Sequence, residues 1–200
     1  MADLDAGSFT SWVEHTMAAQ VTGVGVEVPC GDCTACCRSS YFIHVGPDET
    51  ETLRRIPRQL QFPAPGLPAG HVVLGYDERG RCPMFSDGRC SIYEHRPRTC
   101  RTYDCRIFPA TGLLPDDDDK ALITAQAARW RFELDTVRDR RTHAAVRAAA
   151  VFVRDRAASG ADGKAPTTSR VAISAVRAHR AFLDPDVVPD DDTVRTTLDD

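Results

Sequence analysis

The sequence predicts an α+β fold: a small, irregular, cysteine-rich domain with short hairpin strands, followed by C-terminal helices. Three observations support this class. All eight cysteines lie between residues 30 and 105 of a 200-residue chain. An Asp87-Gly88 pair within that range is a strong signal for a two-residue hairpin turn. From residue 116 to residue 159 there is no glycine or proline, as expected for helical segments.

The composition excludes several classes of protein. Apolar residues make up 42% of the chain and charged residues 27%, which is ordinary for a globular protein and argues against disorder. The formal net charge of −4 does not favour nucleic acid as a partner. There is no signal-like start and no apolar run near the ~20 residues of a membrane span. We therefore expect a cytoplasmic protein that does not contact the membrane; the sequence identifies no protein partner.

Short elements are predicted for the N-terminal half. Residues 8–20 are predicted to form a helix, because Phe9, Trp12 and Thr16 recur at helical spacing and Ser8 can cap the first turn. Beyond it we expect a strand over 41–45, a helix over 47–56 opened by Pro47, a loop over 57–70 and a strand over 71–76.

Helices are predicted from residue 120 onward. Thr136 and Asp139 have the spacing of a capping box, so a break near residue 135 is expected to divide two helices. Trp130 and Phe132 are two residues apart and cannot both face the core of one helix. We expect Trp130 to be buried and Phe132 to lie at the break or against the cysteine-rich domain. One helical face is predicted to contain Ile123, Ala127, Trp130, Leu134 and Val137.

Three regions follow from this pattern. Residues 1–115 are predicted to form the cysteine-cluster domain with its N-terminal helix, and residues 116–183 a helical extension. Within the extension, a polar linker over 159–169 precedes a last helix over 170–183. Residues 184–200 are rich in aspartate and are predicted to be a disordered tail.

The cysteines are interpreted as metal ligands rather than as disulfides, because cytoplasmic thiols are kept reduced. The first block is Cys30, Cys33, Cys36 and Cys37. A C-x-x-C step directs both thiolates to one centre through a tight turn, and three thiolates at steps of three resemble the run that binds a cubane cluster. The adjacent side chains of Cys36 and Cys37 are expected to point apart, and so to serve two sites or to give one ligand and one neighbouring thiol.

The second block contains Cys82, Cys90, Cys100 and Cys105. A regular hairpin would place Cys82 and Cys90 on opposite faces, but Pro83 interrupts the ladder beside Cys82, so whether the two share a site stays open. Pro97 suits the start of a short helix, which would place Cys100 about one turn further on.

The ligand count predicts that the two blocks come together. The first block offers only three well-spaced thiolates to one centre, so a fourth has to come from the second block. We therefore expect one compact region to hold Cys30, Cys33, Cys36, Cys82, Cys90 and Cys100. All eight cysteines are candidate metal ligands: Cys30, Cys33, Cys36, Cys37, Cys82, Cys90, Cys100 and Cys105.

Two further residue types bear on this centre. Residues 79–106 carry seven arginines against three acidic residues, and this positive charge could offset that of thiolates. The candidates are Arg38, Arg96, Arg98, Arg101 and Arg106, although ordinary solvated arginines would give the same pattern. His44 lies within a predicted strand, and we expect a structural histidine there, while noting that imidazole binds both zinc and iron.

This pattern resembles the YkgJ-type cysteine-cluster family, whose CxxCxxCC signature is associated with chelation of zinc or iron. The resemblance covers roughly residues 28–110, in two blocks that occur in the same order. Cys105 is absent from the commonest form of the family pattern. With it the chain has eight cysteines, which would allow two sites of four cysteines each. The matching residues are Cys30, Cys33, Cys36 and Cys37, then Cys82-Pro83, Gly88-Arg89-Cys90-Ser91-Ile92-Tyr93, Arg96-Pro97 and Cys100-Arg101.

The resemblance implies a metal-binding protein that holds an iron–sulfur cluster or zinc, with iron–sulfur slightly favoured, in a structural or a redox and sensing role. One relative in the family is a flagellin lysine methylase, which implies the alternative of an iron–sulfur-dependent modification enzyme by analogy. The sequence carries no nucleotide-binding, hydrolase or zinc-protease motif. The sequence therefore identifies no catalytic residue, and whether the protein is an enzyme stays open.

Overall fold

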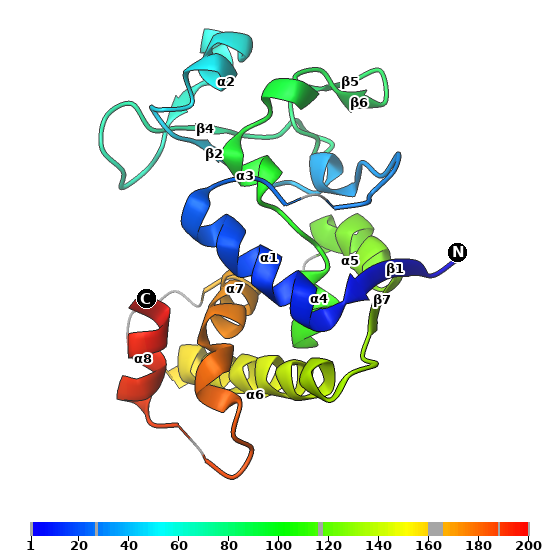
Figure 1. The fold of residues 1–200 in the computed structure, drawn as a ribbon. Coiled ribbons are helices and arrows are strands. Elements are labelled where there is room, and N and C mark those ends of the chain that lie inside the picture. Colours follow the sequence, from blue (N-terminus) through cyan, green and yellow to red (C-terminus); the bar gives the residue numbers. More distant parts are fainter. Residues whose placement is uncertain (1, 27, 116–117, 160–165, 188, 200) are drawn as a thin grey trace. The chain divides into compact units, whose positions relative to one another are not determined.

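The computed structural model describes every residue except 1, 27, 116–117, 160–165, 188 and 200 (Figure 1). The α+β class is confirmed, with 49% of the chain in helices and 12% in strands. Most of the predicted polar linker, and the start of the predicted helical extension, lie outside the described residues. Throughout the described part of the chain, every helix is too short or too polar to cross a lipid bilayer.

The chain forms two compact units, which are described separately. Unit 1 consists of residues 1–18, 105–115 and 124–200, and unit 2 consists of residues 19–104 and 116–123. This division differs from the predicted boundary at residue 115, because the start of the chain packs with the C-terminal helices rather than with the cysteine-rich segment. The helix predicted over 8–20 is confirmed as α1 (Phe9–Thr22), and the Ser8 hydroxyl accepts a hydrogen bond from Ser11 N at 3.4 Å.

Unit 1 contains a two-stranded parallel sheet of β1 (Leu4–Ser8) and β7 (Trp130–Glu133). The prediction of a helix through Trp130 is wrong, because burial alternates along β7 with the period of a strand. The prediction that Trp130 is buried is confirmed, since only 2% of it is exposed. Phe132 packs edge-on against Phe9, with ring centroids 4.9 Å apart. Two aromatic residues on alternate positions favour a strand over a helix here.

The helices of unit 1 pack mainly through small side chains. α7 (Thr168–Ala178) packs against α6 (Val137–Ser159), α4 (Ile107–Thr111) and α8 (Asp191–Asp199). A short 3₁₀ turn, η5 (His179–Phe182), extends α7. One buried cluster consists of Ala149, Ala150, Ala175, Ala178 and Val194.

The tail was predicted to be disordered, but the structure places a helix, α8, within it. Val194 in α8 is only 4% exposed, because it enters the alanine-rich cluster between α6 and α7. Asp191 and Asp192 occupy the first turn of α8, where negative charge favours a helix. The acidic residues therefore stabilise the start of a helix whose apolar side chain Val194 is buried.

The capping box at the start of α6 is present as predicted. Asp139 N donates to Thr136 Oγ1 at 3.0 Å, and Thr136 Oγ1 donates in turn to Asp139 Oδ2 at 2.6 Å. The same carboxylate accepts hydrogen bonds from Ser8 Oγ and Thr10 N, each at 3.0 Å. Asp139 thus joins the start of α6 to the start of α1, and these bonds, led by that from Thr136, lower the pKa of its carboxyl group.

We predict that Asp139→Asn lowers the melting temperature of unit 1 at neutral pH. The pKa of Asp139 is lower in the folded chain than in the unfolded chain, so its carboxylate stabilises the fold above about pH 4, the ordinary aspartate value. That stabilisation is lost as the pH falls through the folded value. Thermal unfolding by circular dichroism should therefore show a difference between the two proteins at pH 7 that shrinks in acid. A difference independent of pH would contradict a role for the charge.

Unit 2 is built from very short elements. Its sheet has the order β2-β4-β3, with all pairs antiparallel. The predicted strands are confirmed in shortened form. The loop predicted over 57–70 contains the unexpected edge strand β3. Its proline is tolerated because an edge strand needs no backbone donor on its outer side. The strands are β2 (Ile43–Val45), β3 (Phe62–Pro63), β4 (Val72–Leu74), β5 (Phe85–Ser86) and β6 (Arg89–Cys90).

The helices of unit 2 are equally short. The helix predicted to open at Pro47 begins instead at Thr50, because a turn precedes it: Glu49 N donates to Gly46 O at 3.1 Å, and Gly46 N donates to Glu49 Oε1 at 2.9 Å. The α-helices are α2 (Thr50–Arg55) and α3 (Arg98–Arg101), and α5 (Ala121–Ala127) begins here. The 3₁₀ turns are η1 (Ala35–Arg38), η2 (Arg58–Leu60), η3 (Tyr93–His95) and η4 (Asp118–Lys120).

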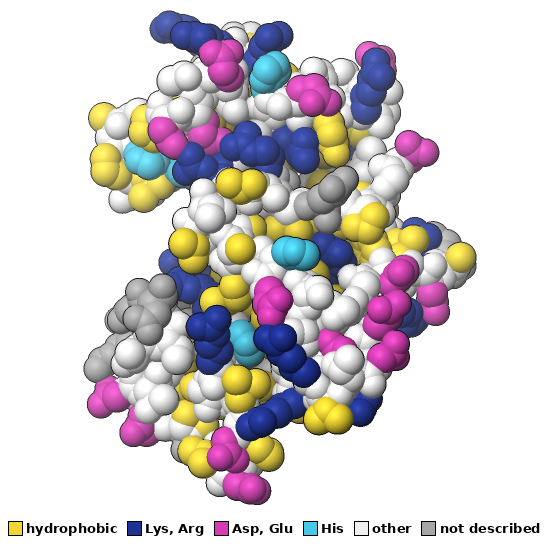
Figure 2. Space-filling view, viewed as in Figure 1, with side chains coloured by type: hydrophobic (Ala, Val, Ile, Leu, Met, Phe, Trp, Pro, Cys, Tyr) yellow, Lys and Arg dark blue, Asp and Glu magenta, His cyan; other side chains and the backbone are white. Residues whose placement is uncertain are grey.

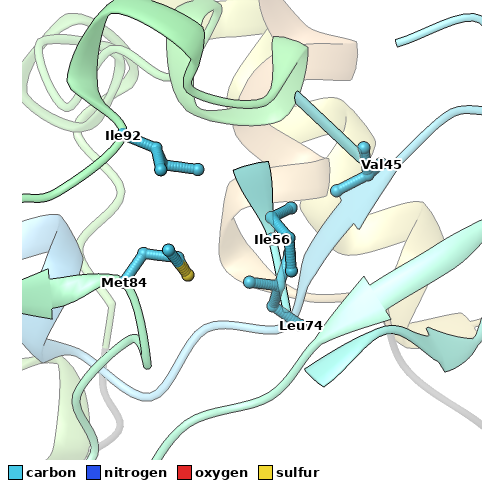
Figure 3. Packing of buried hydrophobic residues seen from close by; sticks show 5 residues of the cluster. All are labelled: Val45, Ile56, Leu74, Met84 and Ile92. Atoms are coloured by element: carbon cyan, nitrogen blue, oxygen red, sulfur yellow. The ribbon is translucent and has the colours of Figure 1, made fainter. Parts of the chain in front are cut away.

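One small hydrophobic cluster forms the core of unit 2 (Figure 3). Two of the cysteines, Cys82 and Cys90, pack against this cluster as partly buried residues. The second cysteine block is therefore attached directly to the core, which positions its thiols through packing. The buried members of the cluster are Val45, Ile56, Leu74, Met84 and Ile92.

Candidate metal centre

The hairpin of the second block has the predicted register. Phe85 pairs with Cys90 and Ser86 pairs with Arg89. Asp87 and Gly88 have φ values of 49° and 78°, and two successive positive φ values are what a type I′ hairpin turn requires. Cys90 thus lies on a strand whose position is set by a local turn.

The two cysteine blocks meet through their backbones. Cys82 N donates a hydrogen bond to Cys37 O at 2.9 Å, and Ser40 N donates to Gly80 O at 2.9 Å. These bonds align the end of the first block with the start of the second, across forty or more residues of sequence. The ligand count predicts that the two blocks meet, but nothing in the sequence predicts these backbone hydrogen bonds, because neither segment has the alternation of a regular strand.

Four thiols from both blocks share one electrostatic environment: Cys36, Cys82, Cys90 and Cys100. Burial is the main cause that raises the pKa of Cys100, and the neighbouring charges of the other three thiols raise it further. Burial likewise raises the pKa of Cys82, with contributions from Cys90 and Cys36. The structure therefore brings together four of the six cysteines that were expected to converge, and it places Cys82 and Cys90 within reach of each other's charge.

The position of Cys100 depends on α3. Pro97 directly precedes this helix, and its carbonyl accepts hydrogen bonds from Cys100 N at 2.8 Å and Arg101 N at 3.0 Å. The prediction that Pro97 introduces a short helix carrying Cys100 is thus confirmed. Val26 N donates to Arg101 O at 3.0 Å, which ties the chain before the first block to the end of the same helix.

Cys36 and Cys37 do not point apart, contrary to the prediction. Their thiols are joined by a hydrogen bond, which is the main cause lowering the pKa of Cys36 to about 7 and raising the pKa of Cys37. Both residues lie in the 3₁₀ turn η1. The cysteine pair can therefore present two sulfur atoms to the same region.

Cys30 and Cys33 occupy the two ends of a tight turn. Cys33 N donates to Cys30 O at 3.1 Å, and Gly31 between them has a φ of 54°, a conformation that favours glycine. Both cysteines are half-buried and belong to unit 2. This is the local geometry that the C-x-x-C spacing predicts.

Cys105 belongs to unit 1, whereas the other seven cysteines belong to unit 2. Its side chain is buried, and Trp130 Nε1 donates a hydrogen bond to its sulfur at 3.3 Å. The family resemblance also has no counterpart for this residue. Cys105 therefore has a packing role in the core of unit 1 that is visible in its contacts.

Among the candidate arginines, Arg96 acts on the thiols. Its charge lowers the pKa of Cys36 and opposes the rise at Cys100. The guanidinium is held over the Tyr93 ring, 4.1 Å from its centroid, and donates to Tyr93 O at 2.9 Å. Arg98 instead makes an ion pair with Asp48. Figure 2 shows a band of basic side chains across unit 2 at the level of α3.

The donor set fits a thiophilic metal by its chemistry, since zinc and iron–sulfur clusters are both held by cysteine thiolates. Within the residues that the structure describes, no three His, Cys, Asp or Glu side chains are arranged so that they could hold an ion as they stand. Binding therefore requires the sulfurs to be drawn together by side-chain rotation, for which the exposed Cys36 has room.

Comparison with known families supports the chemistry of this site. Residues 29–126 match the family model CxxCxxCC, described as a putative zinc- or iron-chelating domain. The matched range includes all of unit 2 except residues 19–28, and it also covers residues 105–115 and 124–126 of unit 1. No curated protein and no solved structure is significantly similar to the chain.

Proposed function

We propose, from the match of residues 29–126 to the CxxCxxCC family model, a metal-binding protein whose unit 2 is organised by zinc or an iron–sulfur cluster. The observation that carries the proposal is the convergence of Cys36, Cys82, Cys90 and Cys100. Besides burial, the charges of Cys36, Cys82 and Cys90 raise the pKa of Cys100, and those of Cys90 and Cys36 raise the pKa of Cys82. Cys37 lies beside them, and the turn of Cys30 and Cys33 precedes them.

The proposed role of the metal is structural. Unit 2 has strands of two or three residues and α-helices of four to six residues before residue 105, so regular secondary structure contributes little to its stability. A metal bound by cysteines can contribute on the order of 10 kcal/mol of folding free energy. The iron–sulfur form would add the capacity for a redox or sensing role, through the same thiols.

Charge supports the same proposal. Four thiolates around Zn²⁺, or around a [4Fe–4S]²⁺ core, leave a centre with a net charge of about −2. Arg96 is fixed near the thiols by its contacts with Tyr93, so its guanidinium is placed to offset part of that charge. Its contribution is to hold the centre in the deprotonated, metal-bound state.

Purification without oxygen tests the proposal and identifies the metal. Iron with inorganic sulfide and a brown colour would indicate an iron–sulfur cluster, and stoichiometric zinc in a colourless protein would indicate a zinc site. We expect Cys100→Ser to lose most of the bound metal and Cys105→Ser to retain it, because only Cys100 shares the environment of the other thiols. Equal retention in both variants would contradict the proposed ligands.

A further inference from the structure

A pair of histidines lies on the sheet of unit 2, apart from the cysteines. His44 Nε2 and His71 Nδ1 are 2.9 Å apart, with ring planes inclined by 19° and centroids separated by 5.1 Å. From this geometry we propose that His44 and His71 form a second metal site, selective for a borderline divalent cation such as Ni²⁺, Cu²⁺ or Zn²⁺. The proposal is independent of the thiol centre and of its metal.

The strand register explains why the two side chains meet. His44 pairs with Val73, and Val45 pairs with Val72. Val45 is buried in the core, so His44 points to the opposite face of the sheet. His71 lies two residues before Val73 and therefore shares that face as the diagonal neighbour of His44, which is within reach of a long side chain.

The backbone of each histidine is held in place. Thr99 Oγ1 donates to His44 O at 2.8 Å, and Ala64 N donates to His71 O at 3.0 Å. Both side chains are partly exposed, so a hydrated cation can reach them from solvent. Two imidazoles fixed from neighbouring strands lose little conformational entropy when they bind a common ion.

The separation of the nitrogens suits coordination. Zinc–imidazole bonds are about 2.0–2.1 Å long, and two such ligands at right angles place their nitrogens about 2.9 Å apart. The two rings now share one N–H···N hydrogen bond, in which one nitrogen donates and the other accepts. Binding needs lone pairs on both facing nitrogens. Each ring achieves this as a neutral tautomer with its proton on the far nitrogen, His44 Nδ1 or His71 Nε2, once both rings turn so that their lone pairs point at the ion and not at each other.

The surroundings of the two histidines provide a nearby carboxylate but no third protein ligand for a cation. The exposed Asp48 carboxylate interacts electrostatically with His71, but it makes an ion pair with Arg98. No third His, Cys, Asp or Glu side chain in the described residues completes a three-ligand group. Two imidazole nitrogens therefore supply the protein ligands and water supplies the rest, a donor set that suits borderline metals rather than Mg²⁺ or Ca²⁺.

Equilibrium dialysis against Ni²⁺ tests this site on the full chain with its thiol centre already loaded. We expect the protein to bind one further equivalent of Ni²⁺, and His44→Gln and His71→Gln each to lose it while keeping the metal of the thiol centre. The matched control is His15→Gln, because His15 is exposed and lies on α1; this variant should bind Ni²⁺ as the parent does.

A second measurement separates binding from stability. Paramagnetic Ni²⁺ should broaden the imidazole NMR signals of His44 and His71 before those of the other histidines. The proposal is overturned if the parent protein binds no further Ni²⁺, or if both glutamine variants keep it. It is also overturned if the variants melt at a lower temperature but bind Ni²⁺ unchanged, because the pair would then be a structural hydrogen bond. Loss of Ni²⁺ only in Cys100→Ser would assign it to the thiols.

Discussion

Removal of the metal is expected to unfold unit 2 while the helices of unit 1 stay folded. The hydrophobic cluster in unit 2 has five buried residues, and two of the candidate ligands, Cys82 and Cys90, pack directly against it. Without metal, the thiols that surround Cys100 contribute no bond that holds the two blocks together. Unit 1 has its own core and contains the 23-residue helix α6.

Limited proteolysis and circular dichroism, with and without a chelator, check this expectation. Cleavage between residues 30 and 104 should rise sharply when the metal is removed, while most of the helical signal is retained. Acid should act in the same direction as the chelator, because protons compete with metal for the thiolates. Unchanged protease resistance in the metal-free protein would mean that the cysteines form a reduced, packed cluster rather than a ligand set.

Truncation of Trp130 is expected to be the most damaging single substitution in unit 1. The side chain is 2% exposed, and its indole N–H bonds the Cys105 sulfur at 3.3 Å. Trp130→Ala removes a large buried ring and leaves a cavity, which typically costs about 3–5 kcal/mol of unfolding free energy. Trp130→Phe keeps most of the ring volume and loses only the hydrogen bond, so its effect should be smaller.

Urea unfolding followed by far-UV circular dichroism measures both variants. The matched control is Val137→Ala, because Val137 is 74% exposed and its truncation creates no cavity. We expect the control to change the unfolding free energy by no more than about 0.5 kcal/mol. A loss of similar size in Trp130→Ala and in the control would contradict the central place of Trp130 in the core.

The features that could be predicted from the sequence are those set by residues close together in the chain. The register of the Asp87-Gly88 hairpin follows from the turn type alone, and the capping box at Thr136 and Asp139 follows from a three-residue spacing. The meeting of the two cysteine blocks was also predictable, because one metal needs more ligands than the first block supplies.

The missed features depend on partners that are distant in sequence. The lack of glycine and proline around β7 favours a helix, whereas the alternation of its aromatic residues favours a strand, and its partner β1 lies more than a hundred residues away. α8 is not predicted from the sequence because its acidic composition favours disorder, and the burial of Val194 depends on distant residues of α6 and α7. The meeting of His44 and His71 required the register of β2 and β4, which no turn of two or three residues determines.

The parallel pairing of β1 with β7 affects the order in which parts of the chain can fold during synthesis at the ribosome. β1 leaves the ribosome early, but it cannot pair until residues 130–133 follow, so unit 1 stays incomplete while the whole cysteine-bearing segment emerges. Thiols of unit 2 are consequently accessible to metal before unit 1 closes. The chain should thus tolerate late metal supply poorly, since exposed cysteines that wait without metal are open to oxidation.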